Sequence, residues 1–144
     1  MLEEGLTRFR ELGHKAGTAW VLSFFGRRLT HLQQFSTARL VFHEALVSFH
    51  QLKSVIGVIF SAEGMAGLSL AQGRLKESVQ IFAWTIATRK AINNPLPAGE
   101  EEETVSALAT LRAVLGDAAF NTAWAEGEKM TLEEAIELAL MDVL

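Results

Sequence analysis

Four histidines and one run of glutamates are the residues of this 144-residue chain whose chemistry would suit a metal or acid–base site: His14, His31, His43, His50 and Glu100 to Glu103. His43 and His50 are seven residues apart, which separates them by two helical turns, whereas zinc-binding pairs use adjacent turns. Consecutive glutamates on a helix point in different directions, so their run predicts a solvated helix start. The chain also has no cysteine and no Gly-Xaa-Ser-Xaa-Gly motif. We therefore predict no enzyme activity, no metal and no cofactor.

The composition is that of a folded, helical protein. Apolar residues make up 49% of the chain, and only two residues are proline, the strongest helix breaker. Mean hydropathy is +0.21. No apolar run approaches the length of a membrane span, and no basic start precedes an apolar core and a cleavage site. We expect a soluble, unexported, cytoplasmic protein.

The charges are divided unevenly along the chain. Residues 1–96 contain 11 lysines and arginines against 6 acids, whereas residues 97–144 contain 2 against 11. This division could draw the two halves together or toward a second copy, or it could simply solvate the outer faces. A nucleic-acid site would need the basic residues on one face with aromatic residues between them. Most aromatic residues fall at core spacing instead, so we do not expect nucleic-acid binding.

The apolar residues repeat with a period of 40. Leu2, Leu6, Phe9 and Leu12 coincide, after that shift, with Phe42, Leu46, Phe49 and Leu52, and Gly17 coincides with Gly57. A fixed period of this size indicates stacked supersecondary units, each of which buries its apolar face against a neighbour. We predict a half repeat at 1–16 and full repeats at 17–56 and 57–96.

Apolar spacing of three and four predicts the helices within these units. The expected ranges are 2–12, 19–32, 37–52, 57–72 and 75–92. Gly57, Gly64 and Gly67 each lower intrinsic helicity by about 1 kcal/mol relative to alanine. We expect close helix packing to offset this cost.

Residues 97–144 have a different character. Pro95 and Pro97 end the array, because each disfavours helix at the preceding residue. A helix beginning at the glutamate run is expected next, then one after Gly116-Asp117. A capping box at Thr131 to Glu134 opens the last helix. We predict an acidic, helical C-terminal cap.

The repeat resembles a known family at specific positions. In the first full unit they are Leu22, Phe25-Gly26, Leu29, Ala38, Phe42 and Ala45, and in the second Ala62, Met65-Ala66, Ser69, Ser78, Phe82 and Thr85. This order is similar to the signature of tetratricopeptide (TPR) repeats. The usual period of that family is about 34 residues, so the period of 40 found here implies longer helices in each hairpin. The chain also resembles the C-terminal end of bacterial signal-transducing NTPases and LuxR-type transcriptional regulators. It contains no P-loop and no helix-turn-helix signature, so neither parent activity is expected in this segment.

The resemblance implies an all-α, right-handed superhelical stack of antiparallel hairpins that acts as a non-enzymatic protein-interaction or regulatory module. In TPR arrays the first helix of each hairpin lines a concave groove. Matching the spacing gives these groove residues: Trp20, Ser23, Arg27, Thr30, His31, Phe60, Glu63, Gly67 and Leu70. Aromatic residues and arginine are typical of interaction hot spots. Trp20 and Phe60 also fit core positions, so both interpretations stay open.

Two alternatives follow from the same pattern. In the first, the groove holds a small effector and the chain is a sensor. In the second, the chain self-associates, because residues 2–12 match the second helix of a hairpin whose first helix is missing. Leu2, Leu6 and Phe9 would then be uncovered, and they predict a homodimer through the N-terminal helix, with the chain forming one end of something longer.

Overall fold

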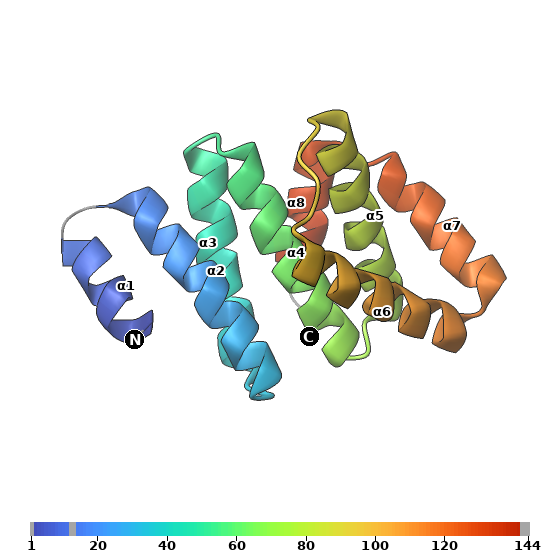
Figure 1. Cartoon of the computed structure of the whole chain (residues 1–144), viewed down its shortest axis with the longest axis horizontal. Helices are drawn as coiled ribbons and strands as arrows, with labels where there is room; N and C mark the ends of the chain where they lie inside the picture. Colours follow the sequence, from blue (N-terminus) through green and yellow to red (C-terminus); the bar gives the residue numbers. More distant parts are fainter. Residues whose placement is uncertain (1, 12–13, 142–144) are drawn as a thin grey trace. The chain divides into compact units, whose positions relative to one another are not determined.

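The chain folds entirely into α-helices over the part that the structure describes. The structure is a computed structural model that describes residues 2–11 and 14–141, without the side chains of residues 2, 6, 9 and 11. Within these ranges it contains α1 (Leu2–Glu11), α2 (Lys15–His31), α3 (Phe35–Gln51), α4 (Val55–Ala71), α5 (Leu75–Ala91), α6 (Ala98–Leu115), α7 (Asp117–Glu128) and α8 (Leu132–Leu140), and no strand (Figure 1). The all-α prediction is confirmed.

Four successive helices share one length and one spacing. α2, α3, α4 and α5 each have 17 residues. Their first residues are 20 positions apart, and three residues connect each helix to the next. The 40-residue period of the sequence is therefore two helix-turn units, which is one hairpin.

The turns that end these four helices have the same backbone conformation. Their central residues, Gln33, Lys53, Gly73 and Asn93, have φ of 61°, 57°, 78° and 55°. In the first turn the Gln34 N–H donates to the Leu29 carbonyl at 2.9 Å and the Gln33 N–H to the Thr30 carbonyl at 3.0 Å. The other three turns repeat this pair of hydrogen bonds, which defines the Schellman motif. The left-handed residue stops each helix and reverses the chain.

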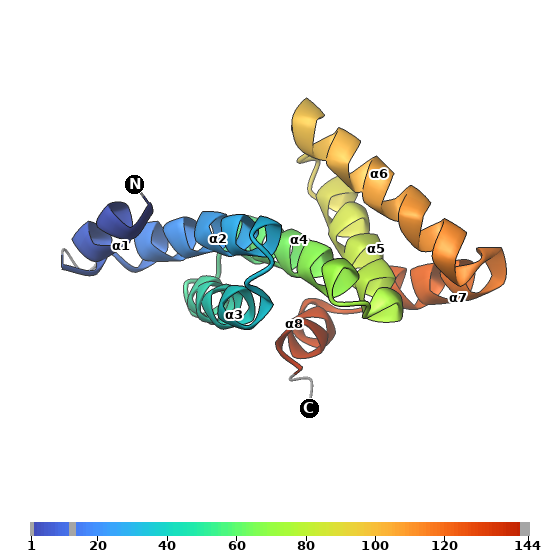
Figure 2. The ribbon, with the colours of Figure 1, turned by 90° about the horizontal axis from the view of Figure 1, so that it is seen from below.

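The described part divides into two compact units, unit 1 (Met1–Leu68) and unit 2 (Ser69–Leu144). The boundary falls inside α4. In unit 1, α2 packs between α1 and α3 (Figure 1). In unit 2, α5 is central, and Figure 2 shows α6 and α8 on opposite sides of it. The predicted division at residues 96 and 97 and the superhelical arrangement stay predictions.

Glycines in unit 1 make room for two phenylalanines of α3. A Cβ added to Gly26 would lie 2.7 Å from the Phe42 ring, and one added to Gly64 would also overlap that ring. Gly57 likewise adjoins the Phe49 ring. The predicted close packing is thus confirmed at Gly57 and Gly64. It is wrong at Gly67, where no described atom beyond the adjacent residues and backbone of its own helix lies within 4 Å of an added Cβ.

Unit 2 is held by a similar close approach and by a helix cap. A Cβ at Gly127 of α7 would overlap the Gln80 carbonyl oxygen of α5 and lie 2.8 Å from the Ala83 Cβ. At the start of α8 the Thr131 hydroxyl accepts the Glu134 N–H at 3.1 Å, and the Glu134 carboxylate accepts the Thr131 N–H at 2.9 Å. This arrangement confirms the predicted capping box.

Candidate functional site

Three side chains on α2 and two on α4 form one cluster in unit 1. Trp20, Phe24 and Arg27 follow one another at spacings of four and three, which places them along one helix face. Phe60 and Glu63, three residues apart on α4, meet this face. We call these five residues the aromatic–arginine cluster.

Arg27 is held by both residues of α4. Its guanidinium carbon lies 3.9 Å from the centre of the Phe60 ring, within the range of a cation–π contact. Nη2 donates a hydrogen bond to the Phe60 carbonyl at 3.0 Å and lies 3.9 Å from Oε1 of Glu63. The Arg27 side chain is 25% exposed and that of Glu63 only 7%. Arg27 is therefore fixed in place, with one edge reaching solvent.

The aromatic rings extend from the core to the surface. Trp20 meets Phe49 edge-on at a centroid distance of 4.9 Å and Phe60 at 5.2 Å. Phe24 continues the chain of rings, 5.1 Å from Phe60. Phe60 is buried, Trp20 is half-buried, and Phe24 is 51% exposed. Phe24 is thus a large, solvent-exposed apolar side chain that packs against the buried ring of Phe60.

Three of the remaining predicted groove residues of unit 1 lie elsewhere on α2, and the fourth, Gly67, lies on α4. Ser23 is fully buried, donates to the Ala19 carbonyl at 3.1 Å and lies 2.9 Å from the Ser61 hydroxyl. The Thr30 hydroxyl donates to the Gly26 carbonyl at 2.9 Å. His31 is exposed at the last position of α2.

Other predicted residues fall outside this cluster. Leu70 belongs to unit 2, where its carbonyl accepts the Gly73 N–H at 3.1 Å. The side chains of Leu2, Leu6 and Phe9 lie outside the described part of the chain, so self-association through them stays a prediction.

The structure thus brings together Trp20, Arg27, Phe60 and Glu63 from the predicted set. Sequence reasoning missed Phe24, although its position between Trp20 and Arg27 on the same helical face was readable from the spacing. It left Trp20 and Phe60 open between a groove position and a core position. In the structure the Phe60 ring is buried and the Trp20 ring is half-buried.

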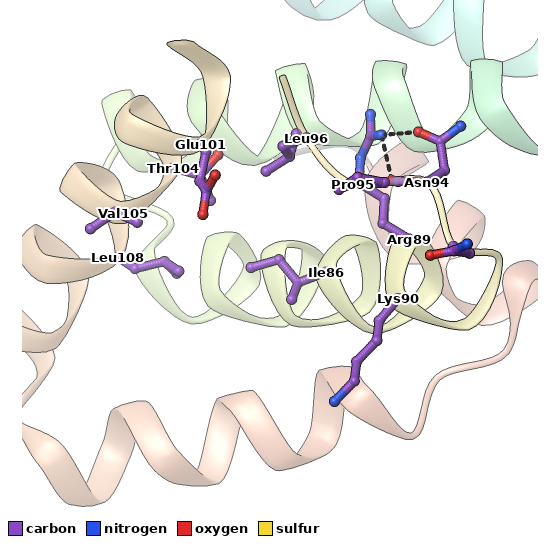
Figure 3. A pocket seen from close by; sticks show the side chains of 11 residues that line it. Ile86, Arg89, Lys90, Asn94, Pro95, Leu96, Glu101, Thr104, Val105 and Leu108 are labelled. Atoms are coloured by element: carbon purple, nitrogen blue, oxygen red, sulfur yellow. Dashed lines mark hydrogen bonds between the residues drawn. The ribbon is translucent and has the colours of Figure 1, made fainter. Parts of the chain in front are cut away.

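Unit 2 contains a pocket that the sequence analysis did not predict. Its volume is about 410 Å³, and α5, the segment after it and α6 surround it (Figure 3). A second hollow of about 390 Å³ adjoins α6 and α7, where Arg112 lies 4.2 Å from the centre of the Phe120 ring. The sequence feature that could have indicated the first pocket is the connection at residues 92–97, which is twice as long as each of the three preceding connections.

Two further kinds of site were sought among the described residues, a metal-binding group and a membrane-spanning helix. No group of three or more histidine, aspartate or glutamate side chains among them could hold a metal ion. None of the helices, over the residues that the structure covers, is both long and apolar enough to cross a membrane.

No protein-family model, no curated protein and no solved structure matches this chain.

Proposed function

We propose that this chain is a non-enzymatic protein-interaction or regulatory module of the TPR-like kind, from the C-terminal part of a larger bacterial signalling ATPase or transcriptional regulator. The regular hairpins support this proposal, because such units stack to present a continuous surface. The contact between Gly26 and Phe42 supports it as well, since the TPR signature marks where two helices touch.

The observation that carries the proposal is the exposed ring of Phe24 within the aromatic–arginine cluster. An interface hot spot combines large aromatic area with arginine on a base that loses little entropy on binding. Phe24 is 51% exposed, and its neighbour Phe60 is fixed by Arg27 and Trp20. A partner that covers Phe24 would bury apolar area without having to order the ring beneath it.

The charges of α2 indicate what such a partner carries. The helix includes Lys15, Arg27 and Arg28 and has no aspartate or glutamate. Arg28 is exposed, and His31 follows on the next turn. A protein segment with an apolar anchor flanked by carboxylates fits this surface.

The packing inside the cluster favours a protein partner over a small effector at this place. Arg27 contacts both Phe60 and Glu63, and these side chains occupy the space that a ligand between them would need. Recognition would then take place at Phe24, the exposed member of the cluster, and at Arg28, one turn further along α2.

A displayed library of random peptides, selected on the immobilised chain, tests this proposal. We expect selected peptides to combine an apolar residue with acidic ones. Phe24→Ala should weaken the best peptide about tenfold or more, as at a hot spot, and Arg28→Glu should weaken it through charge. Fluorescence anisotropy of the labelled peptide measures both.

Leu40→Ala is the matched control, because Leu40 on α3 is 71% exposed and lies outside the cluster. It should leave affinity unchanged. Trp20→Ala and Arg27→Ala extend the test where circular dichroism shows that they fold. The proposal fails if Phe24→Ala and Arg28→Glu bind every selected peptide as the unaltered chain does.

The proposed parent protein has its own test. The reading frame upstream of Met1 should encode a nucleotide-binding or regulatory domain. An upstream frame that encodes an unrelated protein would remove the parent assignment and leave the interaction surface untouched.

A further inference from the structure

The connection between α5 and α6 departs from the spacing of the helices before it. It spans residues 92–97, whereas each of the three preceding connections has three residues. It contains Pro95 and Pro97, which resist helical extension. Arg89 of α5 holds this segment, because its Nη1 donates to the Asn94 carbonyl at 3.1 Å and to the Asn94 side-chain oxygen at 2.8 Å. Arg89 therefore holds the connection at residues 92–97 in place at Asn94.

This connection lines an open pocket together with one face of α5 and one of α6. Ile86 comes from α5, Pro95 and Leu96 from the connection, and Val105 and Leu108 from α6 (Figure 3). The volume of about 410 Å³ lies within the range of small-molecule sites, roughly 300 to 1,000 Å³. Every lining residue belongs to unit 2. The pocket thus offers an open, mostly apolar surface of the size that a small organic molecule covers.

The charged residues of the lining differ in where they point. Arg89 is turned toward Asn94, and Lys90 extends away from the apolar residues (Figure 3). Glu101 and Thr104, one turn apart on α6, lie on the side facing Leu96 and Ile86. On the α6 side of the pocket a molecule would meet a carboxylate and a hydroxyl, whereas Arg89, Lys90 and Asn94 lie away from them, at the end of α5 and just after it (Figure 3).

We propose that this pocket binds a small organic cation, with an aromatic or branched apolar body among Ile86, Leu96 and Leu108 and an ammonium group at Glu101 and Thr104. The ammonium donates to the Glu101 carboxylate and the Thr104 hydroxyl, both of which accept hydrogen bonds. The apolar body supplies most of the affinity by leaving water. This site lies wholly in unit 2, so it stands or falls independently of the interaction surface on α2.

Three probes of nearly the same shape test the proposed head-group preference: phenethylammonium, 2-phenylethanol and 3-phenylpropanoate. They are titrated into the full chain while the methyl signals of Ile86, Leu96, Val105 and Leu108 are followed by NMR. Ligands of this size bind such a pocket with dissociation constants on the order of 1 mM. We expect the ammonium probe to bind most tightly, the alcohol less tightly and the carboxylate least.

Two variants and one control locate the site. Glu101→Gln should weaken the ammonium probe about two- to fivefold at low salt, because an exposed ion pair contributes little, and should leave the alcohol unchanged. Glu103→Gln removes the same charge from the same helix outside the pocket lining and should have a smaller effect. Thr104→Trp, checked for folding by circular dichroism, should fill the pocket and abolish methyl shifts for all three probes.

The proposal is overturned if the carboxylate binds as tightly as the ammonium probe. It is equally overturned if no probe shifts the pocket methyls up to its solubility limit, or if folded Thr104→Trp still binds. A Glu101→Gln variant that keeps the full preference for the ammonium probe also contradicts it, since the selectivity would then come from elsewhere.

Discussion

Single residues in unit 1 are fitted to one another with little tolerance, as Phe42 shows. Its ring contacts Gly26 of α2 and Gly64 of α4, and its own side chain is fully buried. A glycine inside a helix costs about 1 kcal/mol relative to alanine. Packing offsets that cost, because the missing Cβ lets the backbones of α2 and α4 approach the Phe42 ring closely.

Gly64→Ala and Gly67→Ala, three residues apart on α4, should therefore have opposite effects. At Gly64 the new methyl overlaps the Phe42 ring, and overpacking of this kind lowers the free energy of unfolding by about 1 to 3 kcal/mol. At Gly67 the methyl meets no described atom within 4 Å, so the helix gains up to about 1 kcal/mol. Urea denaturation followed by circular dichroism measures both. Equal effects of the two substitutions would show that Phe42 moves aside easily.

At the scale of the element, the turn residues decide where helices end. Gln33, Lys53 and Asn93 have positive φ although they carry a Cβ, and only Gly73 is free of that strain. The left-handed conformation costs about 1 to 2 kcal/mol for a residue with a Cβ. The four turns are thus equivalent in hydrogen bonding and unequal in strain.

Lys53→Gly should raise the free energy of unfolding by about 1 kcal/mol, and Gly73→Lys should lower it by a similar amount. The physical reason is the same in both cases, because each substitution removes or adds a Cβ at a left-handed position. Thermal unfolding followed by circular dichroism gives the shift of Tm. Lys53→Ala is the control, since it removes the charge and keeps the Cβ strain. A gain equal to that of Lys53→Gly would assign the effect to charge.

The elements were predictable from the sequence because their signals are local. Apolar spacing identified the helices and their 40-residue period, and the threonine and glutamate of the capping box identified the start of α8. The pocket of unit 2 was not predictable, because it arises from three extra residues in a connection and from how α6 then meets α5. Gly67 shows the same limit, since its surroundings depend on tertiary contacts that spacing does not report.

At the scale of the whole molecule, α4 is the element common to both units. Their boundary lies between Leu68 and Ser69, inside a helix that runs without interruption from Val55 to Ala71. A helix that stopped at Leu68 would leave its last four carbonyls without helical partners. Met65 and Leu68 are buried, so those carbonyls belong to a segment packed in the interior. We therefore expect the unfolding of one unit alone to be unfavourable.

Destabilising unit 2 should consequently lower the stability reported from unit 1. With Trp84→Phe and Trp124→Phe, the remaining tryptophan, Trp20, reports on unit 1 alone. Adding Gly127→Ala introduces a methyl that overlaps the Gln80 backbone oxygen, which cannot move as a side chain can. We expect the urea midpoint of Trp20 fluorescence to fall together with the midpoint from circular dichroism.

Gly99→Ala in the same background is the control, because no described atom lies within 4 Å of an added Cβ there, and it should leave the Trp20 midpoint where it is or raise it slightly. If Gly127→Ala splits the circular dichroism transition in two while the Trp20 midpoint stays fixed, the units unfold independently. The continuous backbone of α4 would then transmit no stability between them. A single transition that shifts as a whole would instead mean that one helix makes the two units a single cooperative structure.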